Sequence, residues 1–569
     1  MWFLRHLDRL DVEMAAVEAL RKEGWIMRAQ WQVVPDDGSL RLEIDFQAGG
    51  ALRKGWLVYP HVFPHAPPML LPRDPEQRWS GHQWGAGGEL CLQIRADNWR
   101  PRYTATDMLL SAQELLSTEG LVNADGRRGR VPSAHAFTEG QNMRFRYFRV
   151  VATPTLIAKV RERGDGCPAK FRCSTFENCV VWTAVKLTPA EAEAWFDPSI
   201  PAPLRDEGYY EGFAVSLPTG DPRADIVRSA YSEGAAALWQ AFSPEPLAGR
   251  KILLAVFPDS VQALSLSADT DEIFRCGMPT TDQSTRLPER HGVLAGAKIV
   301  VLGAGSMGSK VAMSLARSGA REFLIVDDDI LRDSNLVRND LDWRAVGAHK
   351  AEALAERLAL VNPSVKVRTR LQRLGGQMSA KTLQKALEDM SSFDLIVDTS
   401  GSDMCFNYAA AVAKSARIPM VWGRVLAGGY GGYIARSRPG VDPDPHSVRE
   451  QIDVWCSNPD FPPAPPAAAV DYGAEQGDEP PMIADDADVS IISGHLARLA
   501  IDLLTKPRHS DYPSSAYMIG LRAEWIFGEP FSTFGIPLVR VPESEVAPVV
   551  AGNFDPATTF ALTVLRAYA

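Results

Sequence analysis

Apolar residues recur at helical spacing at the start of the chain and at strand spacing soon afterwards. Steps of three and four residues predict a helix with one apolar face, made of Leu4, Leu7, Leu10, Met14, Val17 and Leu20. Two alternating runs flank Asp36, Asp37 and Gly38 in "WQVVPDDGSLRLEIDF", which is typical of a β-hairpin, and "KGWLVYP" predicts a third strand. After a proline-rich stretch, "TATDMLLSAQELLSTEG" predicts a capped helix. We therefore expect a small α+β domain over residues 1–145.

The middle of the chain alternates strand-like and helix-like patterns and carries no recognisable chemical motif. "FRCSTFENCVVWTAVKL" and "KILLAVFPDSVQALSLSA" predict strands, whereas "PAEAEAWF" and "ADIVRSAYSEGAAALWQAF" predict helices. We expect residues 146–285 to form a mixed α/β connecting domain.

From about residue 286 the pattern is strand, glycine turn, helix and strand, which is the order of a parallel α/β sheet. The segment 458–488 is rich in proline and acidic residues and predicts a mobile loop. "VSIISGHLARLAIDLL" then predicts a helix that returns to the core. We expect residues 286–569 to form a Rossmann-like domain, so the whole chain is a multidomain α/β protein.

Length and charge narrow the class of protein. A chain of 569 residues with 46% hydrophobic positions is too long for one core. Its net charge of -10 disfavours nucleic acid as a partner, and we interpret the local runs "GRRGR" and "RFRYFRV" as solvated surface. No window approaches the roughly 18 apolar residues of a membrane span, and the first helix is charged throughout. We expect a cytoplasmic protein with no membrane partner.

The seven cysteines do not form a recognisable metal or disulfide pattern. They are odd in number and contain no Cys-x-x-Cys pair; they are Cys91, Cys167, Cys173, Cys179, Cys276, Cys405 and Cys456. We expect free thiols.

A nucleotide site is predicted by "KIVVLGAGSMGSKVAMSLARSGAREFLIVDDD". It combines a strand, the turn Gly303-x-Gly305-x-x-Gly308, a helix, and a second strand that ends at Asp327. The glycines let the backbone approach a phosphate, the helix N-terminus offers N–H groups, and the acid can bind ribose hydroxyls. NAD and ATP both fit this part.

The loop after that strand favours ATP. It contains Asp329, Asn335 and Arg338, and Lys350 follows in "VGAHK". A hydride-transfer site has little use for these groups, whereas attack on an α-phosphate needs cations and hydrogen-bond donors around the phosphates. Arg338 and Lys350 would supply the positive charge, and an aspartate would hold Mg²⁺.

Several runs in this region together match a known family. "GAGSMGS", "VDDD", "SNLVRND", "VGAHK" and "FDLIVDTSG" resemble, in order and spacing, the adenylating domain of the ThiF/MoeB and ubiquitin-activating enzymes. The resemblance implies that ATP and Mg²⁺ are used to adenylate the C-terminal carboxylate of a protein. It assigns ATP binding to eight residues, which are Gly303, Gly305, Gly308, Asp327, Asp329, Asn335, Arg338 and Lys350.

The metal position departs from that family. A second aspartate usually follows the one that matches Asp398, and Gly401 stands near that place here. Asp398 is therefore the first choice for the metal, and Asp403 the second. The family also tends to use an arginine before the first strand, for which Arg286 and Arg290 are the alternatives.

Cys91 lies in "GGELCLQIRADNW", between a glycine turn and an apolar, strand-like run. A free cysteine is most often a buried structural residue. The surrounding stretch from Tyr59 to Ser117, however, resembles the ubiquitin-conjugating fold, with tyrosine-proline, His82, Cys91-Leu92 and a Trp-x-Pro triplet before a helix. That resemblance implies that Cys91 carries a thioester. The family's His-Pro-Asn triplet is not intact, because Gln83 and Trp84 follow His82.

Cys456, in "DVWCSNPDFPP", is the candidate for the first thioester in the adenylating half. It could equally be a remnant of a zinc pair, or a packing residue. Cys405 is expected to pack against the sheet.

The arrangement resembles bacterial ubiquitin-transferase-like fusions, the Cap proteins found beside cyclic-nucleotide synthases in CBASS antiphage systems. It implies a ubiquitin-conjugating-like domain, a connecting domain and a ThiF-like adenylation domain, with Cys91, Cys456, Arg338 and Lys350 as catalytic residues. The expected partners are a protein whose C-terminus is activated (a cyclic-nucleotide synthase or a ubiquitin-like protein), a target amine and a second copy in a homodimer. The alternatives are a ThiF-like adenylyltransferase for sulfur-carrier or peptide modification with a non-catalytic N-terminal recognition domain, a nucleotide-sensing scaffold and an NAD oxidoreductase.

Overall fold

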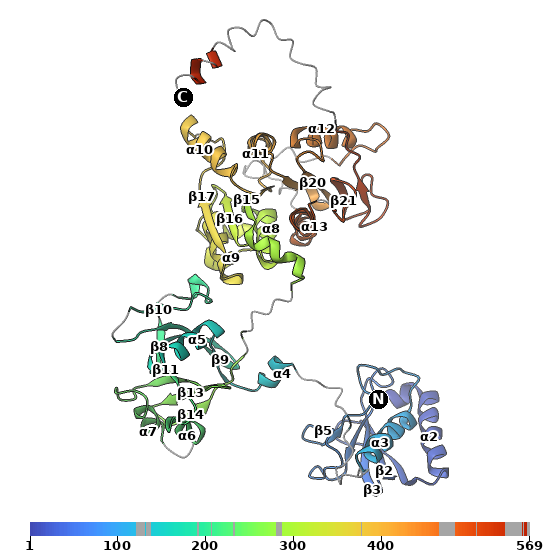
Figure 1. Cartoon of the computed structure of the whole chain (residues 1–569). Helices are drawn as coiled ribbons and strands as arrows, with labels where there is room; N and C mark the ends of the chain where they lie inside the picture. The colour runs from blue at the N-terminus through green and yellow to red at the C-terminus, as the bar shows by residue number, and fades with distance from the viewer. Residues whose placement is uncertain are drawn as a thin grey trace. The chain divides into compact units, whose positions relative to one another are not determined.

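The computed structural model divides the chain into two compact units, Met1–Gln141 and Asn142–Ala569, and Figure 1 traces both. We describe each unit by itself. The residues that the structure describes are 1–120, 131, 138–190, 193–205, 208–230, 234–279, 281, 287–376, 378–465, 484–507, 509–540, 560–561 and 563–565.

The first unit is a four-stranded antiparallel sheet packed against helices. The strand order is β1-β2-β3-β4, and the expected hairpin is confirmed as β1 paired with β2. The expected third strand and second helix are also confirmed, as β3 and α3. The elements are α1 (Trp2–Arg5), α2 (Leu7–Lys22), β1 (Ile26–Val33), β2 (Leu40–Ala48), β3 (Ala51–Tyr59), β4 (Met69–Pro72), β5 (Gln83–Trp84), β6 (Glu89–Leu90) and α3 (Ala105–Gly120).

The first helix differs from the expected one in two ways. It breaks at His6, and Leu4 and Leu7 are 64% and 61% exposed. Glu13 is buried instead, because its carboxylate accepts hydrogen bonds from the Arg9 guanidinium (2.7 Å), the Tyr59 hydroxyl (2.9 Å) and the Ala105 N–H (2.8 Å). The buried face of the helix therefore includes an acidic residue where apolar residues alone were expected.

The second unit begins with an eight-stranded mixed sheet, whose path β10-β9-β8-β11-β12-β13-β14 is joined by β7 beside β9. α5 covers one face of the sheet and contributes Leu156 and Val160 to the hydrophobic core on that side. α6 and α7 cover the other face and contribute Val227 and Leu238 to the core there. The helix α4 (Glu139–Met143) spans the boundary between the two units in the sequence. The elements that follow are β7 (Phe148–Val151), α5 (Pro154–Arg163), β8 (Cys167–Phe176), β9 (Cys179–Leu187), β10 (Trp195–Phe196), β11 (Tyr209–Ser216), α6 (Arg223–Arg228), α7 (Ala235–Gln240), β12 (Arg250–Val256), β13 (Val261–Ser267) and β14 (Ile273–Arg275).

The prediction of a helix in "PAEAEAWF" is wrong for its last two residues. Trp195 and Phe196 form the short strand β10 and pair with Leu187 and Lys186 of β9. The Lys186 ammonium also lies 4.5 Å from the centre of the Phe196 ring. Cross-strand contacts of this kind outweigh a local helical pattern.

The C-terminal part is a second eight-stranded sheet, in the order β17-β16-β15-β18-β19-β20-β21-β22. Pairing is parallel from β17 to β19 and antiparallel beyond it. One face packs against α8, α9 and α13, and the other against α10, α11 and α12. The elements are β15 (Lys298–Leu302), α8 (Ser306–Arg317), β16 (Glu322–Val326), α9 (Lys350–Val361), β17 (Lys366–Arg370), α10 (Ala380–Met390), β18 (Leu395–Asp398), α11 (Asp403–Ala416), β19 (Met420–Val425), β20 (Gly431–Ser437), α12 (Pro445–Cys456), α13 (Asp486–Thr505), β21 (Ala516–Gly520) and β22 (Thr533–Gly535).

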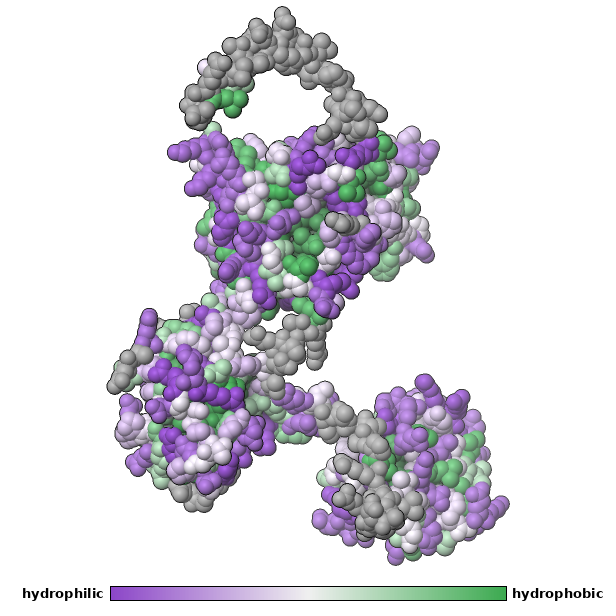
Figure 2. All heavy atoms as spheres, viewed as in Figure 1, coloured by the Kyte–Doolittle hydropathy of each residue, from purple (hydrophilic) through white to green (hydrophobic). Residues whose placement is uncertain are grey.

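Polar residues dominate the visible face of the molecule, with small apolar areas between them (Figure 2). In the part of the chain that the structure describes, every helix is too short or too polar to cross a membrane. The loop expected over 458–488 falls largely on residues 466–483, and "GRRGR" on 126–130, all of which are outside the described residues.

Candidate functional site

The glycine turn between β15 and α8 has a geometry that only glycine permits. Gly303 has φ +88°, in the left-handed region. A Cβ on Gly308 would lie 1.8 Å from the Gly303 carbonyl oxygen, so α8 can pass this close only without a side chain. Gly305 precedes α8, and the space where its Cβ would lie is open. Gly305 therefore leaves open space at the N-terminus of a helix, which is a position that favours anions.

Asp327, just after β16, fixes this turn. One carboxylate oxygen accepts the Ala304 N–H (2.6 Å), and the other accepts the Asp329 N–H (2.9 Å). Burial raises the pKa of the Asp327 carboxyl, and these two N–H groups oppose the rise. The residue expected to bind ribose therefore positions the glycine turn.

Lys350 and Asp329, both expected to bind ATP, form an ion pair with each other. Lys350 is the first residue of α9 and is almost fully buried. Burial acts to raise the pKa of Asp329, but the Lys350 ammonium outweighs it and holds that pKa below its usual value. A cation is thus held at the edge of the sheet where the glycine turn lies.

The loop between β16 and α9 holds the other expected ATP residues. Asn335 accepts the Arg332 N–H at 3.0 Å, and the Arg338 N–H donates to the Asn335 carbonyl at 3.2 Å. Sequence reasoning missed Asn339, which is buried and donates from Nδ2 to the Ala304 carbonyl (3.1 Å). Asn339 therefore ties this loop to the glycine turn, and its position beside Arg338 was the only available signal.

Asp398 ends β18, which runs beside β15, and it pairs in register with Leu302 just before the glycine turn. It is buried, and one carboxylate oxygen accepts hydrogen bonds from the N–H (3.0 Å) and hydroxyl (2.7 Å) of Ser400. Burial raises the pKa of this carboxyl. Thr399, also missed from the sequence, donates to the Leu302 carbonyl at 2.9 Å and locks the two strand ends together.

A magnesium ion would have to be held here with few protein ligands. Among the described residues, no group of three or more histidine, cysteine or acidic side chains could hold a metal. Mg²⁺ in nucleotide sites commonly takes one or two carboxylates plus phosphate oxygens, and the second oxygen of Asp398 suits that role. Asp403 suits it less well, because its carboxylate is ion-paired with Arg449.

Of the two arginines expected before β15, the described residues include Arg290 alone. Arg286 lies outside the described residues. Arg290 is exposed in the 3-10 helix Glu289–Gly296.

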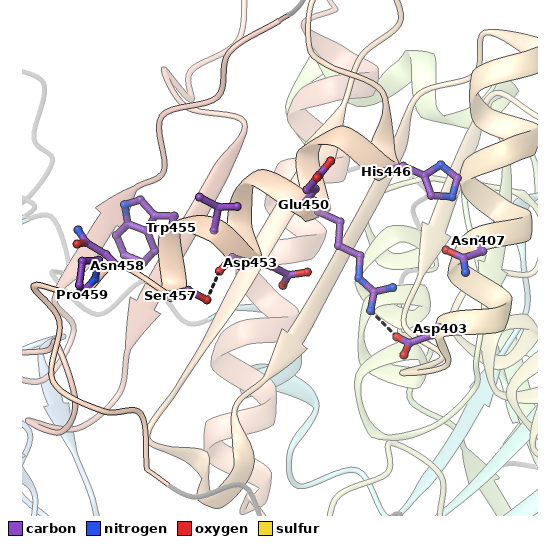
Figure 3. Close-up of a pocket in the computed structure, with 11 residues that line it drawn as sticks. Asp403, Asn407, His446, Glu450, Asp453, Trp455, Ser457, Asn458 and Pro459 are labelled. Carbon is purple, nitrogen blue, oxygen red and sulfur yellow. Dashed lines mark hydrogen bonds and ion pairs between the residues drawn. The ribbon is translucent and has the colours of Figure 1, made fainter. Parts of the chain in front are cut away.

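A cavity of about 890 Å³ lies between α11 and α12 (Figure 3). Asp403 and Asn407 from α11 lie at one end, and Trp455, Asn458 and Pro459 at the other. We call it the α12 groove and define it by Asp403, Asn407, His446, Arg449, Glu450 and Asp453. It begins five residues after Asp398, at the N-terminus of α11.

Cys456 is the last residue of α12 and is half-buried against the core of this half. Burial, with a smaller contribution from Asp453, raises the pKa of its thiol to about 11. Since the thiolate is the nucleophile, Cys456 is a weak nucleophile at neutral pH in this conformation.

Cys91 follows β6 in the first unit and is half-buried between the buried Leu90 and Leu92. Its N–H donates to the His82 carbonyl at 2.7 Å. The strand expected in "LQI" after it does not form. Burial raises the pKa of the thiol, Arg95 lowers it and Asp97 raises it further. The sulfur is therefore not sealed inside an apolar core.

The groups around Cys91 shape its loop. His82 Nε2 lies 2.8 Å from the Val131 carbonyl oxygen and 3.8 Å from a Glu119 carboxylate oxygen. Asn98, which sequence reasoning missed, accepts the Arg95 N–H (2.8 Å) and donates to the Gln93 carbonyl (2.7 Å). These bonds fold the chain back on itself just after the thiol.

A family model matches the C-terminal half of the chain. Residues 288–508 match the ThiF family. The chain is 31% identical to the uncharacterized protein y4oA of Sinorhizobium fredii over 28% of this chain and 29% of that protein. It is 31% identical to the ATP-dependent ubiquitin transferase-like protein Cap2 of Enterobacter hormaechei over 23% of this chain and 21% of that protein. It is 30% identical to the probable adenylyltransferase/sulfurtransferase MoeZ of Mycobacterium tuberculosis over 23% of this chain and 32% of that protein. The match thus spans about a third or less of each of these relatives.

Solved structures with some similarity include E. coli MccB with ATP, at 17% identity and a TM-score of 0.33, covering 45% of this chain and 67% of that one. PaaA has 16% identity and a TM-score of 0.32, covering 43% and 66%. The family match covers strands β15 to β20 of the sheet, together with the glycine turn, Lys350 and Asp398 described above. The C-terminal half of the chain therefore contains a ThiF/E1-like adenylating domain.

Proposed function

We propose that this protein is an ATP-dependent, ubiquitin-transferase-like enzyme that adenylates a protein C-terminus and conjugates it to an amine through a thioester. The observation that supports adenylation is the meeting of three features at the carboxyl ends of β15, β16 and β18. These are the glycine turn, the Lys350–Asp329 ion pair and the buried Asp398.

In the adenylation step, a carboxylate oxygen attacks the α-phosphorus of the substrate ATP, and the bond to the bridging oxygen of the β-phosphate breaks. Pyrophosphate leaves and an acyl adenylate forms. Lys350, Arg338 and the N–H groups at the start of α8 would stabilise the charge that develops on the phosphates. Asp398 would hold Mg²⁺, which neutralises phosphate charge when bound.

In the transfer steps, a thiolate attacks the acyl carbon and AMP leaves. An amine then attacks the thioester, and the cysteine departs as a thiolate. We assign the final thioester to Cys91, which is half-buried and has Arg95 in its surroundings. Cys456 remains the proposed first carrier, but it must first lose a proton from a thiol whose pKa is about 11.

The biological setting is part of the proposal. The partial similarity to Cap2 supports a role in bacterial antiphage immunity of the CBASS type. The activated protein would be a cyclic-nucleotide synthase or a ubiquitin-like protein, and the enzyme would act as a homodimer.

A second candidate is a ThiF-like adenylyltransferase for sulfur-carrier or peptide modification, in which the first unit only recognises a partner. The raised pKa values of both Cys91 and Cys456 favour it, because neither thiol is activated in this conformation. The partial similarity to MoeZ, named as an adenylyltransferase/sulfurtransferase, also favours it.

Pyrophosphate exchange into ATP, measured with purified candidate partners, tests both readings. Exchange that is lost in Asp398→Asn, together with a thiol-sensitive adduct that is lost in Cys91→Ala, supports the conjugating enzyme. Exchange without any thiol-sensitive adduct supports the second candidate. If no partner supports exchange, both are contradicted.

A further inference from the structure

The α12 groove contains a preformed carboxylate-binding group, Arg449. Its guanidinium carbon lies 4.7 Å from the centre of the Phe406 ring, and one of its nitrogens is ion-paired with Asp403. A guanidinium offers a planar fork of donors that matches a carboxylate, and stacking on an aromatic ring fixes its plane. The groove therefore already binds one carboxylate, which belongs to the protein itself.

That carboxylate is easily displaced. The Asp403 side chain is 75% exposed, and it stands at the first position of α11. An exposed ion pair contributes about 1 kcal/mol or less to stability, so a competing carboxylate can replace Asp403 at little cost.

The pair also lies beside the proposed reaction centre. Asp398 ends β18, and the turn to Asp403 is held by Ser400, whose hydroxyl donates to Asp398 (2.7 Å) and accepts the Ser402 N–H (3.2 Å). A carboxylate bound at Arg449 would thus lie near the strand end where we propose adenylation.

The groove also contains two acidic side chains besides Asp403. Glu450 and Asp453 both line the cavity, and Asp453 lies one helical turn after Arg449 on α12. Both are exposed, and no described residue forms an ion pair with either one. With Arg449 neutralised by a carboxylate, this end of the groove favours a cation.

We propose that the α12 groove binds the C-terminal tail of the activated protein, with its terminal carboxylate displacing Asp403 from Arg449 and a basic side chain lying against Glu450 and Asp453. This inference rests on the proposed adenylation and adds a substrate class, namely tails with a lysine or arginine close to the C-terminus.

The spacing along α12 indicates where the basic residue falls. Arg449 and Asp453 are four residues apart, which is about 6 Å along a helix axis. An extended peptide advances about 3.3 Å per residue, so the basic residue would stand two positions before the terminal one.

Calorimetric titration of the full chain with three synthetic peptides tests this directly. They are Ala-Ala-Lys-Gly-Gly as the free acid, the same sequence as the C-terminal amide, and Ala-Ala-Glu-Gly-Gly as the free acid. We expect the lysine acid to bind about tenfold more tightly than its amide and about fivefold more tightly than the glutamate peptide.

Four variants assign the effects to residues. Arg449→Gln should remove the preference for acid over amide, and Asp403→Asn should strengthen binding of the lysine acid about threefold by freeing Arg449. The double variant Glu450→Gln with Asp453→Asn should abolish discrimination between lysine and glutamate. Glu388→Gln, which removes one negative charge at an exposed position of α10 outside the groove, as Asp403→Asn does inside it, should leave all affinities unchanged.

Equal affinity for the three peptides, or no binding by any of them, would overturn the inference. Pyrophosphate exchange separates it from the proposed function. If pyrophosphate exchange persists while the three peptides bind equally, only the proposal for the α12 groove is contradicted. If the protein discriminates between the peptides but no partner supports pyrophosphate exchange, the proposed adenylation is contradicted. The α12 groove would then still be a binding site for basic C-terminal tails.

Discussion

At the scale of single residues, the two proposed carrier thiols share a feature that composition could not reveal. Both Cys91 and Cys456 are half-buried, and burial raises the pKa of each. The sequence singled out both residues but did not show how far each thiol is from ionisation, because that depends on neighbours brought in by folding. For Cys91 these neighbours are Arg95 and Asp97, which form an ion pair at 2.8 Å.

That ion pair predicts how Cys91 reactivity responds to mutation. Asp97→Asn removes the charge that raises the thiol pKa, so the thiolate fraction at pH 7.5 should increase, and alkylation of Cys91 by iodoacetamide should accelerate about twofold. Arg95→Gln should slow it. Residue-specific alkylation rates from mass spectrometry, measured across pH, check this, and Cys456 in the same sample is the internal control. An identical profile in all three proteins would contradict this picture.

At the scale of elements, the sequence predicted most of what lies along one strand or turn and missed what joins separate segments. The glycine turn, Asp327 and the strand that ends at Asp398 followed from local pattern. Asn339 and Thr399 did not, since each acts through a hydrogen bond to a carbonyl far away in the sequence. Glu13 was missed for the same reason, because its partners Tyr59 and Ala105 come from other elements.

Alanine at either of two glycines of the same turn should have different effects, one on stability and the other on ATP binding. Gly308→Ala puts a methyl group against the Gly303 carbonyl, and overpacking of this kind costs about 1–3 kcal/mol. Gly305→Ala meets no atom within 4 Å and has an ordinary φ of -72°, so stability should be kept while the space for a phosphate is filled. Thermal unfolding combined with ATP titration distinguishes them, and retained ATP binding in Gly305→Ala would argue against a phosphate site there.

Buried Glu13 predicts a pH dependence for the first unit. Burial raises its pKa above the ordinary value of 4.5, so the folded state holds this proton more tightly than the unfolded state. The group's contribution to stability is therefore greatest below the unfolded pKa and declines as pH rises through the folded pKa. Denaturant-dependent hydrogen exchange of β3 and α3 in the full chain measures this, and Glu13→Gln should flatten the decline. A contribution that instead grows with pH would show that the carboxylate is favoured in the fold.

At the scale of the whole molecule, the sequence predicted two kinds of chemistry on one chain, and the residues proposed for each lie in different units, Met1–Gln141 and Asn142–Ala569. The adenylating half depends on long-range contacts of its own. Arg436 is fully buried on β20, where its guanidinium contacts Asp502 of α13 (3.3 Å) and Ser510 (2.7 Å). Such a network joins a strand to a helix more than 60 residues later.

Asp502→Ala should destabilise this half by about 3 kcal/mol, because it leaves the buried Arg436 charge without its partner. Asp511→Asn breaks an exposed ion pair with Lys506 and should cost less than about 1 kcal/mol. Hydrogen exchange of β20 in the full chain reports both. Equal effects of the two variants would mean that the buried pair contributes no more than the surface one.

Joining carrier and activator on one chain makes charging of Cys91 an intramolecular event in the proposed function. A chain cut by a protease site introduced between Thr138 and Glu139, just before α4, should charge Cys91 at a rate that depends on protein concentration. The uncut chain should not, because its effective concentration is set by the connection. Gel-based measurement of the adduct over a dilution series checks this, and a concentration-independent rate in the cut protein would speak against the relay.

The burial of Cys456 has a consequence beyond catalysis. Peroxide attacks thiolates and spares thiols, so a sulfur whose pKa lies near 11 is slow to become sulfenic acid. In the proposed function, the desolvation that would delay acylation of Cys456 would therefore also slow its oxidation.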